Sequence, residues 1–267
     1  MADFDSRHEP VLSASGSAPT AALSLPPFES LPILTPDAAA LEKHAIVGFA
    51  ARDLRSRPFA LLRSQIQRRL PPGQARLIGV TSATPAAGKS FVSLNLAASL
   101  ARVSDAPVYL IDFDLRRGTV ASELGFDCLS GISDVLAGEQ PDLTEVGRRI
   151  EGANLAVYAT RPIEEGSSEL LSGERFTRLI AGLRDLPANT IVICDLPPVF
   201  VGDDAMITLE KLDGYIMVID SGQTTTRQVT QTIQLLDPTP CVGTILNRYR
   251  GGIADSYGYG QSYGKDT

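Results

Sequence analysis

The sequence has little of what several common classes of enzyme and metal site require. Its 267 residues include no tryptophan and only two histidines, His8 and His44, both ahead of every motif discussed below. This scarcity argues against a Ser-His-Asp hydrolase and against a histidine-ligated zinc site. The three cysteines, Cys128, Cys194 and Cys241, lie far apart in the chain without metal-ligand spacing. Such cysteine usage is typical of a reducing cytoplasm.

Long apolar runs are also missing, since no stretch of about 18 apolar residues occurs and no basic-then-apolar signal peptide begins the chain. We therefore expect a cytoplasmic protein without a membrane-spanning segment. The net charge of −7 disfavours general nucleic-acid binding. A hydrophobic content of 43% is ample for one α/β domain of about 200 residues with tails.

The central motif is a phosphate-binding loop at residues 83–90, Ala-Thr-Pro-Ala-Ala-Gly-Lys-Ser. The apolar run 77–80 predicts a strand before the loop, and apolar residues at helical spacing predict a helix over 90–102. This is the Walker A pattern, with alanine in place of the first glycine. Lys89 would supply charge to the phosphates and the Ser90 hydroxyl would ligate Mg²⁺, beside backbone N–H groups of the loop. The loop residues expected to contact the nucleotide are Thr84, Pro85, Ala86, Ala87, Gly88, Lys89, Ser90 and Phe91.

Two further strands end in acidic residues. The stretch 107–113 predicts a strand that runs into Asp112 and Asp114, whose carboxylates point the same way in extended backbone. The stretch 190–194 predicts a strand closed by Asp195 and two prolines, which is the Walker B pattern. In doubly wound sheets such strand ends face the crevice in which ligands bind. We therefore expect all three aspartates to serve a Mg²⁺·nucleotide site, with Asp195 acting on the metal through water.

Strands alternate with helices along the chain, which predicts a three-layer α/β fold of the P-loop NTPase type with a mainly parallel sheet and helices on both faces. We expect three parts: a largely disordered segment 1–50, with a possible helix over 38–51, a core 51–250 and a flexible tail 251–267. The other strands are expected at 154–160, 214–220 and 241–247, and the other helices at 59–70, 130–138, 145–150, 167–184 and 224–236.

The segment 51–76 stands apart by its charge, because it holds seven arginines and one acid. Its apolar residues, among them Phe59 and Ile66, mark one face of a helix. Two interpretations stay open: a solvated helix packed on the sheet, or a contact with an acidic partner or anionic lipid head groups.

With these motifs in place, the chain resembles the bacterial tyrosine kinases (BY-kinases). The resemblance covers roughly residues 57–263 and rests on TSATPAAGKS, on YLIDFDLRRG as the family's second acidic motif, and on IVICDLPPV, in that order. It implies an ATP- and Mg²⁺-dependent autokinase that regulates capsule or exopolysaccharide polymerisation and export. Asn247 resembles the adenine-contacting position, and Asp112 or Asp114 would act on the attacking hydroxyl. The acceptors would be the tail residues Tyr257, Tyr259 and Tyr263.

The resemblance also implies a homo-oligomer recruited to the inner face of the membrane by the cytoplasmic tail of a separate membrane-spanning activator. Three positions depart from the family pattern. Arg57 and Ala60 replace the first two residues of a Glu-x-x-Arg-x-x-Arg motif used in subunit contacts, of which Arg63 remains. Ala86 replaces the commoner glycine, a mild change if its φ is negative.

Two other functions use the same motifs. A spatial-regulator ATPase would hydrolyse ATP to switch dimerisation, but such proteins usually carry a lysine where this chain has Thr84. A non-catalytic ATP-binding scaffold of a polysaccharide export complex would also keep the P-loop and its acids. The kinase interpretation is favoured by Thr84 and by the tyrosine-containing tail.

Overall fold

The computed structural model describes residues 23–70, 73–140 and 142–249. The tail residues Tyr257, Tyr259 and Tyr263 lie outside this part, so their expected role as acceptors stays a prediction. Within it, none of the helices combines the length and the apolar character needed to cross a lipid bilayer.

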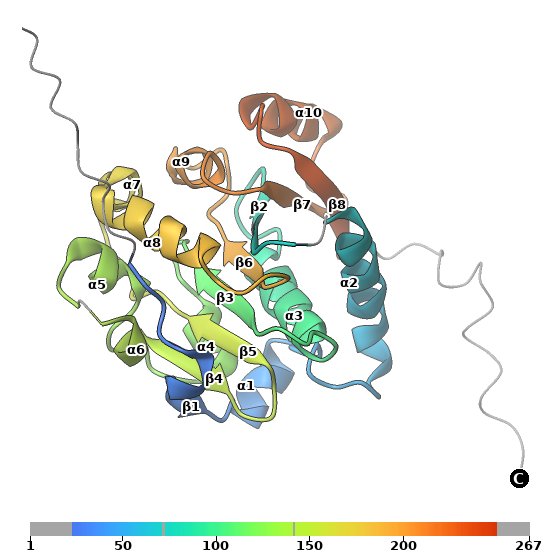
Figure 1. The fold of residues 1–267 in the computed structure, drawn as a ribbon. Coiled ribbons are helices and arrows are strands. Elements are labelled where there is room, and N and C mark those ends of the chain that lie inside the picture. Colours follow the sequence, from blue (N-terminus) through green and yellow to red (C-terminus); the bar gives the residue numbers. More distant parts are fainter. Residues whose placement is uncertain (1–22, 71–72, 141, 250–267) are drawn as a thin grey trace, which may run out of the picture.

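The described strands form one sheet in the order β1-β4-β5-β3-β6-β2-β7-β8 (Figure 1). Neighbouring strands pair in parallel except β4 and β5, so β1 and β4 together run opposite to the remaining strands. This confirms the expected mainly parallel α/β fold. The bounds are β1 Ile33–Leu34, β2 Arg76–Ser82, β3 Val108–Asp112, β4 Gly147–Ile150, β5 Leu155–Tyr158, β6 Ile191–Asp195, β7 Gly214–Asp220 and β8 Cys241–Asn247.

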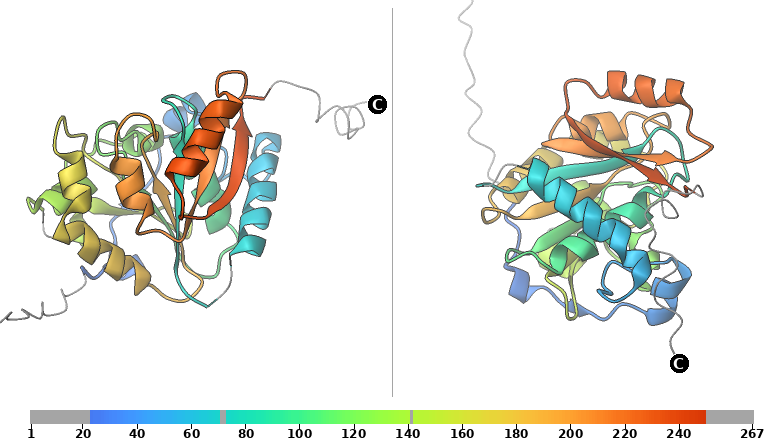
Figure 2. Two further views of the ribbon diagram at one scale, coloured as in Figure 1. Left: turned by 90° about the horizontal axis from the view of Figure 1, so that it is seen from above. Right: turned by 90° about the vertical axis from the view of Figure 1, so that its right-hand side faces the viewer.

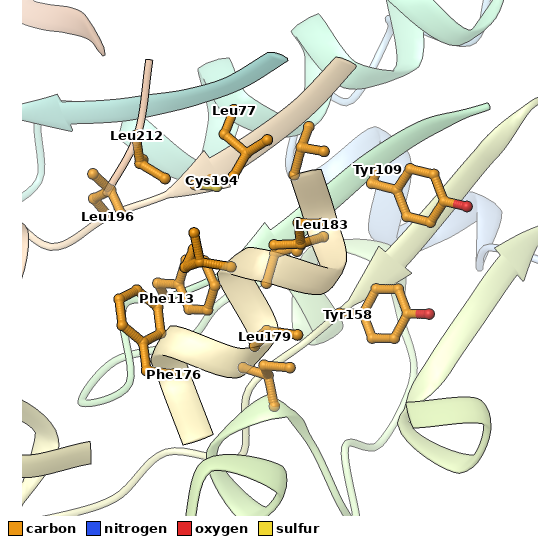
Figure 3. Packing of buried hydrophobic residues seen from close by; sticks show 14 of the residues in the cluster. Leu77, Tyr109, Phe113, Tyr158, Phe176, Leu179, Leu183, Cys194, Leu196 and Leu212 are labelled. Carbon is orange, nitrogen blue, oxygen red and sulfur yellow. The ribbon is translucent and has the colours of Figure 1, made fainter. Parts of the chain in front are cut away.

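Helices cover both faces of the sheet (Figure 2). One core unites the sheet with α2, α3 and α4, and the other unites it with α5, α8 and α9. Figure 3 shows the second core, where the aromatic rings of Phe113 and Phe176 lie side by side in an edge-on arrangement. The helices are α1 Ala38–Lys43, α2 Arg57–Arg69, α3 Lys89–Ala101, α4 Val120–Leu124, α5 Ile132–Ala137, α6 Leu143–Val146, α7 Ser167–Ser172, α8 Glu174–Arg184, α9 Asp204–Leu209 and α10 Thr226–Leu235, with short 3₁₀ turns at Phe28–Ser30 and Leu54–Ser56.

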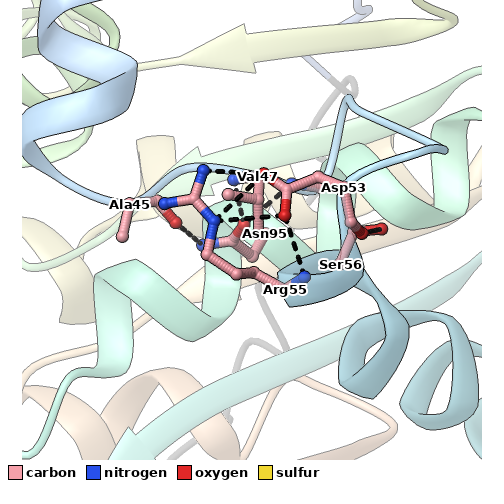
Figure 4. A network of polar contacts seen from close by, with 7 residues as sticks. Ala45, Val47, Asp53, Arg55, Ser56 and Asn95 are labelled. Atoms are coloured by element: carbon pink, nitrogen blue, oxygen red, sulfur yellow. Dashed lines mark hydrogen bonds and ion pairs between the residues drawn. The ribbon is translucent and has the colours of Figure 1, made fainter. Parts of the chain in front are cut away.

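The segment before the core differs most from expectation. Residues 23–50 do not form a disordered leader: β1 pairs with β4, and Leu31 is buried in the core. The helix of this segment ends at Lys43 rather than near Ala51. The chain then continues into a loop that α3 holds by hydrogen bonds (Figure 4). The core therefore begins well before residue 51.

Two expected helices are also wrong in extent. The helix expected over 145–150 is a short helix, α6, followed by β4, because residues 147–149 pair with β5 and residues 149–150 pair with β1. The helix expected over 167–184 breaks into α7 and α8 at Gly173, whose backbone is extended (φ −74°, ψ 164°).

The arginine-rich segment is used partly inside the molecule. Its helix, α2, packs on α3, and Arg63 Nη1 donates to the carbonyl oxygen of Ser99 (3.0 Å). Arg69 donates to the Val242 carbonyl at the edge strand β8. Arg55 pairs with Asp53 of the same segment. These contacts support the interpretation of α2 as a helix packed on the core.

Candidate nucleotide and phosphoryl-transfer site

The phosphate-binding loop connects β2 to α3, in the sheet centre. Gly88 precedes the helix with a φ of 92°, and Ala86 has a φ of 61°. The condition under which alanine at position 86 would be a mild change, a negative φ, is therefore not met, because the loop turns through the left-handed region at this residue. The first backbone N–H groups of α3 have no acceptor inside the helix and carry its positive dipole end, which suits a phosphate.

Asn247 lies at the end of β8, directly above this loop. Its Nδ2 donates to the Ala87 carbonyl oxygen (2.8 Å). A Cβ atom added to Gly88 would come within 2.2 Å of the same nitrogen, so glycine is required there for space as well as for backbone conformation. The nearby Thr84 accepts from the Ser82 hydroxyl through its carbonyl (2.7 Å). Asn247 thus braces the loop, while its expected contact with adenine stays a prediction.

Successive side chains at the end of β3 point to opposite sides, which directs Asp112 and Asp114 away from the core that holds Phe113. Phe113, between them, is fully buried, and its ring lies edge-on to Phe176 with centroids 5.3 Å apart. Asp112 Oδ1 accepts from the backbone N–H of Asp114 (3.1 Å), and Oδ2 accepts from that of Val120 (3.3 Å). Asp112 therefore holds the loop that follows its own strand.

Asp114 is placed to act on a ligand. Its Oδ2 lies 3.8 Å from Lys89 Nζ, and both side chains are about nine-tenths buried. The structure thus brings the end of β3 and the P-loop lysine together, as the two motifs predict. A bound phosphate would therefore meet Lys89 beside an acid.

Asp195, the Walker B aspartate, pairs in register with Asp112 across β3 and β6. Its Oδ1 accepts from the Ser93 hydroxyl of α3 (2.9 Å), and the nearby Ser90 hydroxyl acts to lower its pKa. The other oxygen, Oδ2, is buried without a hydrogen-bond partner. An unpartnered oxygen on a fully buried acid costs free energy and points to a ligand that completes the site.

The electrostatics of the crevice favour a bound cation. Burial raises the pKa of Asp112 well above its usual value, and the charges of Asp195 and Asp114 raise it further. Burial also raises the pKa of Asp195 and of Asp114, although Lys89 opposes the shift at both carboxyls. Each shift reports a negative charge that is poorly stabilised by the protein alone.

The donor set fits Mg²⁺ held together with nucleotide phosphates. In residues 23–249 apart from the undescribed gaps, no three His, Cys, Asp or Glu side chains form a preformed metal cage. Mg²⁺ does not need one, because it is usually bound through one or two carboxylates, waters and substrate phosphates. Ser90 and Asp195, with its unpartnered oxygen, fit that mode, and Asp112, whose oxygens accept backbone N–H groups, fits a direct ligand less well.

A cavity of about 350 Å³ lies over the P-loop. Of the expected nucleotide contacts, Pro85, Ala86, Gly88, Lys89, Ser90 and Phe91 line it, whereas Ala87 packs in the core. Its other walls were not expected from sequence, because Arg117 and Pro198 lie in the quoted motifs without an assigned role, and the remaining residues belong to no motif. The lining residues missed in this way are Arg117, Thr119, Glu123, Pro198 and Arg248.

Glu123 is the most informative of the missed residues. Its Oε1 accepts from the Thr119 hydroxyl (3.1 Å), and its Oε2 is buried without a partner. Burial, and then the charge of Asp195, raise its pKa to about 7. The only sequence signal was an acid in the short, mostly apolar α4, nine positions after Asp114.

No protein-family model matches the chain. Among curated proteins it is 31% identical over 206 residues to the putative tyrosine-protein kinase EpsB of Ralstonia nicotianae, covering 76% of this chain and 27% of that protein. The chain thus spans about a quarter of that relative's length. It is 28% identical over 221 residues to the tyrosine-protein kinase YwqD of Bacillus subtilis, covering 82% of this chain and 92% of YwqD.

Among solved structures the chain is similar to the kinase domain of VpsO. The TM-score is 0.64 and the sequence identity is 30%, with 73% of this chain and 97% of that domain covered. A match at this identity over nearly a whole domain agrees with the ordered motifs and with the site they form. The chain belongs to the bacterial tyrosine kinase family.

Proposed function

We propose that the chain is an ATP- and Mg²⁺-dependent protein-tyrosine kinase. One observation carries this proposal: two adjoining cavities share Asp114, Arg117 and Pro198. The larger lies over the P-loop, and the smaller, of about 140 Å³, opens beside the Walker B prolines. A donor pocket that adjoins an acceptor pocket at a carboxylate is the arrangement that phosphoryl transfer needs.

On the donor side, the P-loop residues bind and orient the triphosphate. Backbone N–H groups at the start of α3 and the Lys89 ammonium meet the phosphate charge. When bound, Mg²⁺ would neutralise phosphate oxygens, and Ser90 and Asp195 are the residues that fit it. Burial of Lys89, which is 8% exposed, strengthens its interaction with phosphate relative to water.

On the acceptor side, the smaller cavity suits a phenol ring. Its apolar walls include Pro197, Pro198 and Val201, and its charged groups are Asp114, Arg116, Arg117 and Asp204. Asp114 would accept the tyrosyl proton while the phenolic oxygen bonds to the γ-phosphorus and the bond to ADP breaks. Burial raises the pKa of Asp114, which makes its carboxylate a better proton acceptor than an exposed aspartate.

Asp112 has a different role in this proposal. Its oxygens are occupied by backbone N–H groups of the loop that carries Asp114, so it is a positioning residue. We assign the base to Asp114 because Asp114 lines both cavities. The family resemblance alone leaves these two aspartates equivalent.

We further propose that the tail of this chain, or of a neighbouring copy, supplies the acceptor. Arg248 lines the nucleotide cavity, and Tyr257, Tyr259 and Tyr263 follow 9, 11 and 15 residues later by sequence number. An extended chain spans about 3.3–3.6 Å per residue, which is ample reach for the site. The proposal includes oligomerisation, activation by a separate membrane-spanning protein, and control of exopolysaccharide or capsule polymerisation and export.

Intact-mass measurement after incubation with Mg·ATP tests the kinase. The full chain should gain phosphate, and Asp114→Asn should bind nucleotide while transferring about 10²–10⁴-fold more slowly. Asp203→Asn, which removes an acid near the crevice that lines neither cavity, is the matched control and should label as the wild type does. Asp112→Asn should lose less than Asp114→Asn. Release of free phosphate without labelling would indicate an ATPase, and neither product a scaffold.

A further inference from the structure

Thr119 and Glu123 of the α4 region face the P-loop, yet no motif assigns them a role. The Thr119 hydroxyl and Glu123 Oε1 form a local i, i+4 contact of 3.1 Å. That contact accounts for one carboxylate oxygen. The other, Oε2, is buried with no partner among the described residues, although the side chain lines the nucleotide cavity.

A purely structural role does not explain this arrangement. A glutamine in place of Glu123 would cap or pack α4 equally well, because it keeps the Thr119 contact and avoids a buried charge. Burial and the charge of Asp195 both raise the pKa of Glu123, so the carboxylate destabilises the nucleotide-free protein when ionised. A buried acid that lowers stability and has one oxygen without a hydrogen-bond partner is explained if the bound ligand supplies that partner.

A second orphaned oxygen belongs to the same crevice. Asp195 is fully buried and its Oδ2 also lacks a partner. Lys89 is a shared neighbour, because its charge lowers the pKa of both carboxyls against the effect of burial. Lys89 already pairs with Asp114, and the free oxygens of Glu123 and Asp195 have no hydrogen-bond partner among the described residues.

We propose that Glu123 belongs to the metal–nucleotide site as an outer positioning residue, its free oxygen accepting a hydrogen bond from a water on the Mg²⁺ that accompanies the nucleotide. This rests on the proposed function and adds a residue that the P-loop, the paired aspartates and Walker B do not include. Outer groups of this kind typically contribute 10–100-fold to metal affinity.

The test is ADP affinity of the full chain with Mg²⁺ and with EDTA, measured for the wild type and Glu123→Gln by titration calorimetry. In EDTA, Glu123→Gln should bind ADP as tightly as the wild type or more tightly, because one negative charge near the phosphates is gone. With Mg²⁺ the variant should bind about tenfold more weakly. The gain in affinity from Mg²⁺ therefore falls at least tenfold, and a general loss of fold would weaken both measurements alike.

Glu139→Gln is the matched control, because Glu139 is an exposed acid paired with Arg161 outside the crevice. It should keep the wild-type gain from Mg²⁺. The same gain in Glu123→Gln as in the wild type would overturn the inference, and so would failure of this variant to fold in EDTA, since the charge would then be structural. If the wild type itself shows no Mg²⁺-dependent ADP binding, the proposed function fails instead.

Discussion

Two buried polar side chains near the same helix, Asn95 and Asp195, differ in how completely they are satisfied. Asn95, on α3, accepts from the backbone N–H groups of Val47 (2.7 Å) and Gly48 (2.8 Å). Its Nδ2 donates to the carbonyl oxygens of Phe91 (2.9 Å) and Ala45 (3.3 Å), so its hydrogen-bonding capacity is filled (Figure 4). Asp195 accepts from α3 yet keeps one oxygen unpartnered.

The difference separates a structural network from a ligand site. A filled network fixes one conformation, here the loop 45–48 against α3, and its members are costly to remove. A partly filled one lowers the stability of the free protein and is tolerated where a ligand completes it. The same helix thus anchors the loop 45–48 at its middle, and on the proposed function its N-terminal end would bind the ligand.

We call Lys89 and the carboxylates of Asp114, Glu123 and Asp195 the unfilled network, and Asn95 with its partners the filled network. The largest expected effect is the removal of positive charge from the unfilled network. Lys89→Met should reduce phosphoryl transfer by about 10²–10³-fold or more, because the charge that meets the phosphates is lost. The fold should persist, since the methionine side chain fills a similar space. A time course of intact mass with Mg·ATP measures this, and Lys211→Met, at an exposed lysine, is the control. Near-wild-type labelling by Lys89→Met would contradict the P-loop assignment.

Disruption of the filled network should lower the free energy of unfolding. Asn95→Leu leaves two buried backbone N–H groups without an acceptor and should lower the free energy of unfolding by about 3 kcal/mol. Urea denaturation measures this loss. Asn154→Leu, at a partly buried asparagine with one hydrogen bond to the Ser104 carbonyl (3.1 Å), should cost about 1 kcal/mol. Equal losses in the two variants would mean that the filled network has no special weight.

The pH dependence of stability sharpens the comparison, because only the unfilled network has raised carboxyl pKa values. For Glu123 the pKa rises from 4.5 to about 7 on folding. The native state then holds this proton more tightly than the unfolded chain. The resulting stability is fully present below pH 4.5 and is lost as pH rises to about 7, by roughly 3 kcal/mol.

Urea denaturation of the nucleotide-free protein between pH 5 and pH 8 measures this loss as a falling free energy of unfolding. Glu123→Gln should show a flatter profile, whereas Glu139→Gln should follow the wild type. Parallel profiles for the wild type and Glu123→Gln would show that Glu123 does not titrate in this range.

The sequence predicted the structure at the centre of the sheet more accurately than the structure at its edges. The motifs around Lys89, Asp112 and Asp195 combine local turn chemistry with buried strands, so their placement follows from strand order alone. The loop at 45–48 could not be predicted, because its structure depends on Asn95, about 50 residues away in sequence. Glu123 was missed for a related reason, since its environment is created by strands from other parts of the chain.

The smallest expected effect lies within the P-loop itself, at Ala86. Its φ of 61° lies in the left-handed region, which costs a non-glycine residue about 1–2 kcal/mol. Ala86→Gly removes this cost but increases the entropy of the unfolded chain by about 0.5–1 kcal/mol. The net result should be a gain in unfolding free energy of about 0.5 kcal/mol. Ala188→Gly, at an exposed turn residue outside the left-handed region, should instead lower the unfolding free energy.

The strain at Ala86 has a local backbone cause, whereas the instability of the unfilled network has an electrostatic cause. The gain from Ala86→Gly should therefore be the same at pH 5 and pH 8. A gain that changed with pH would mean that the backbone of the loop and the charges of the crevice are coupled.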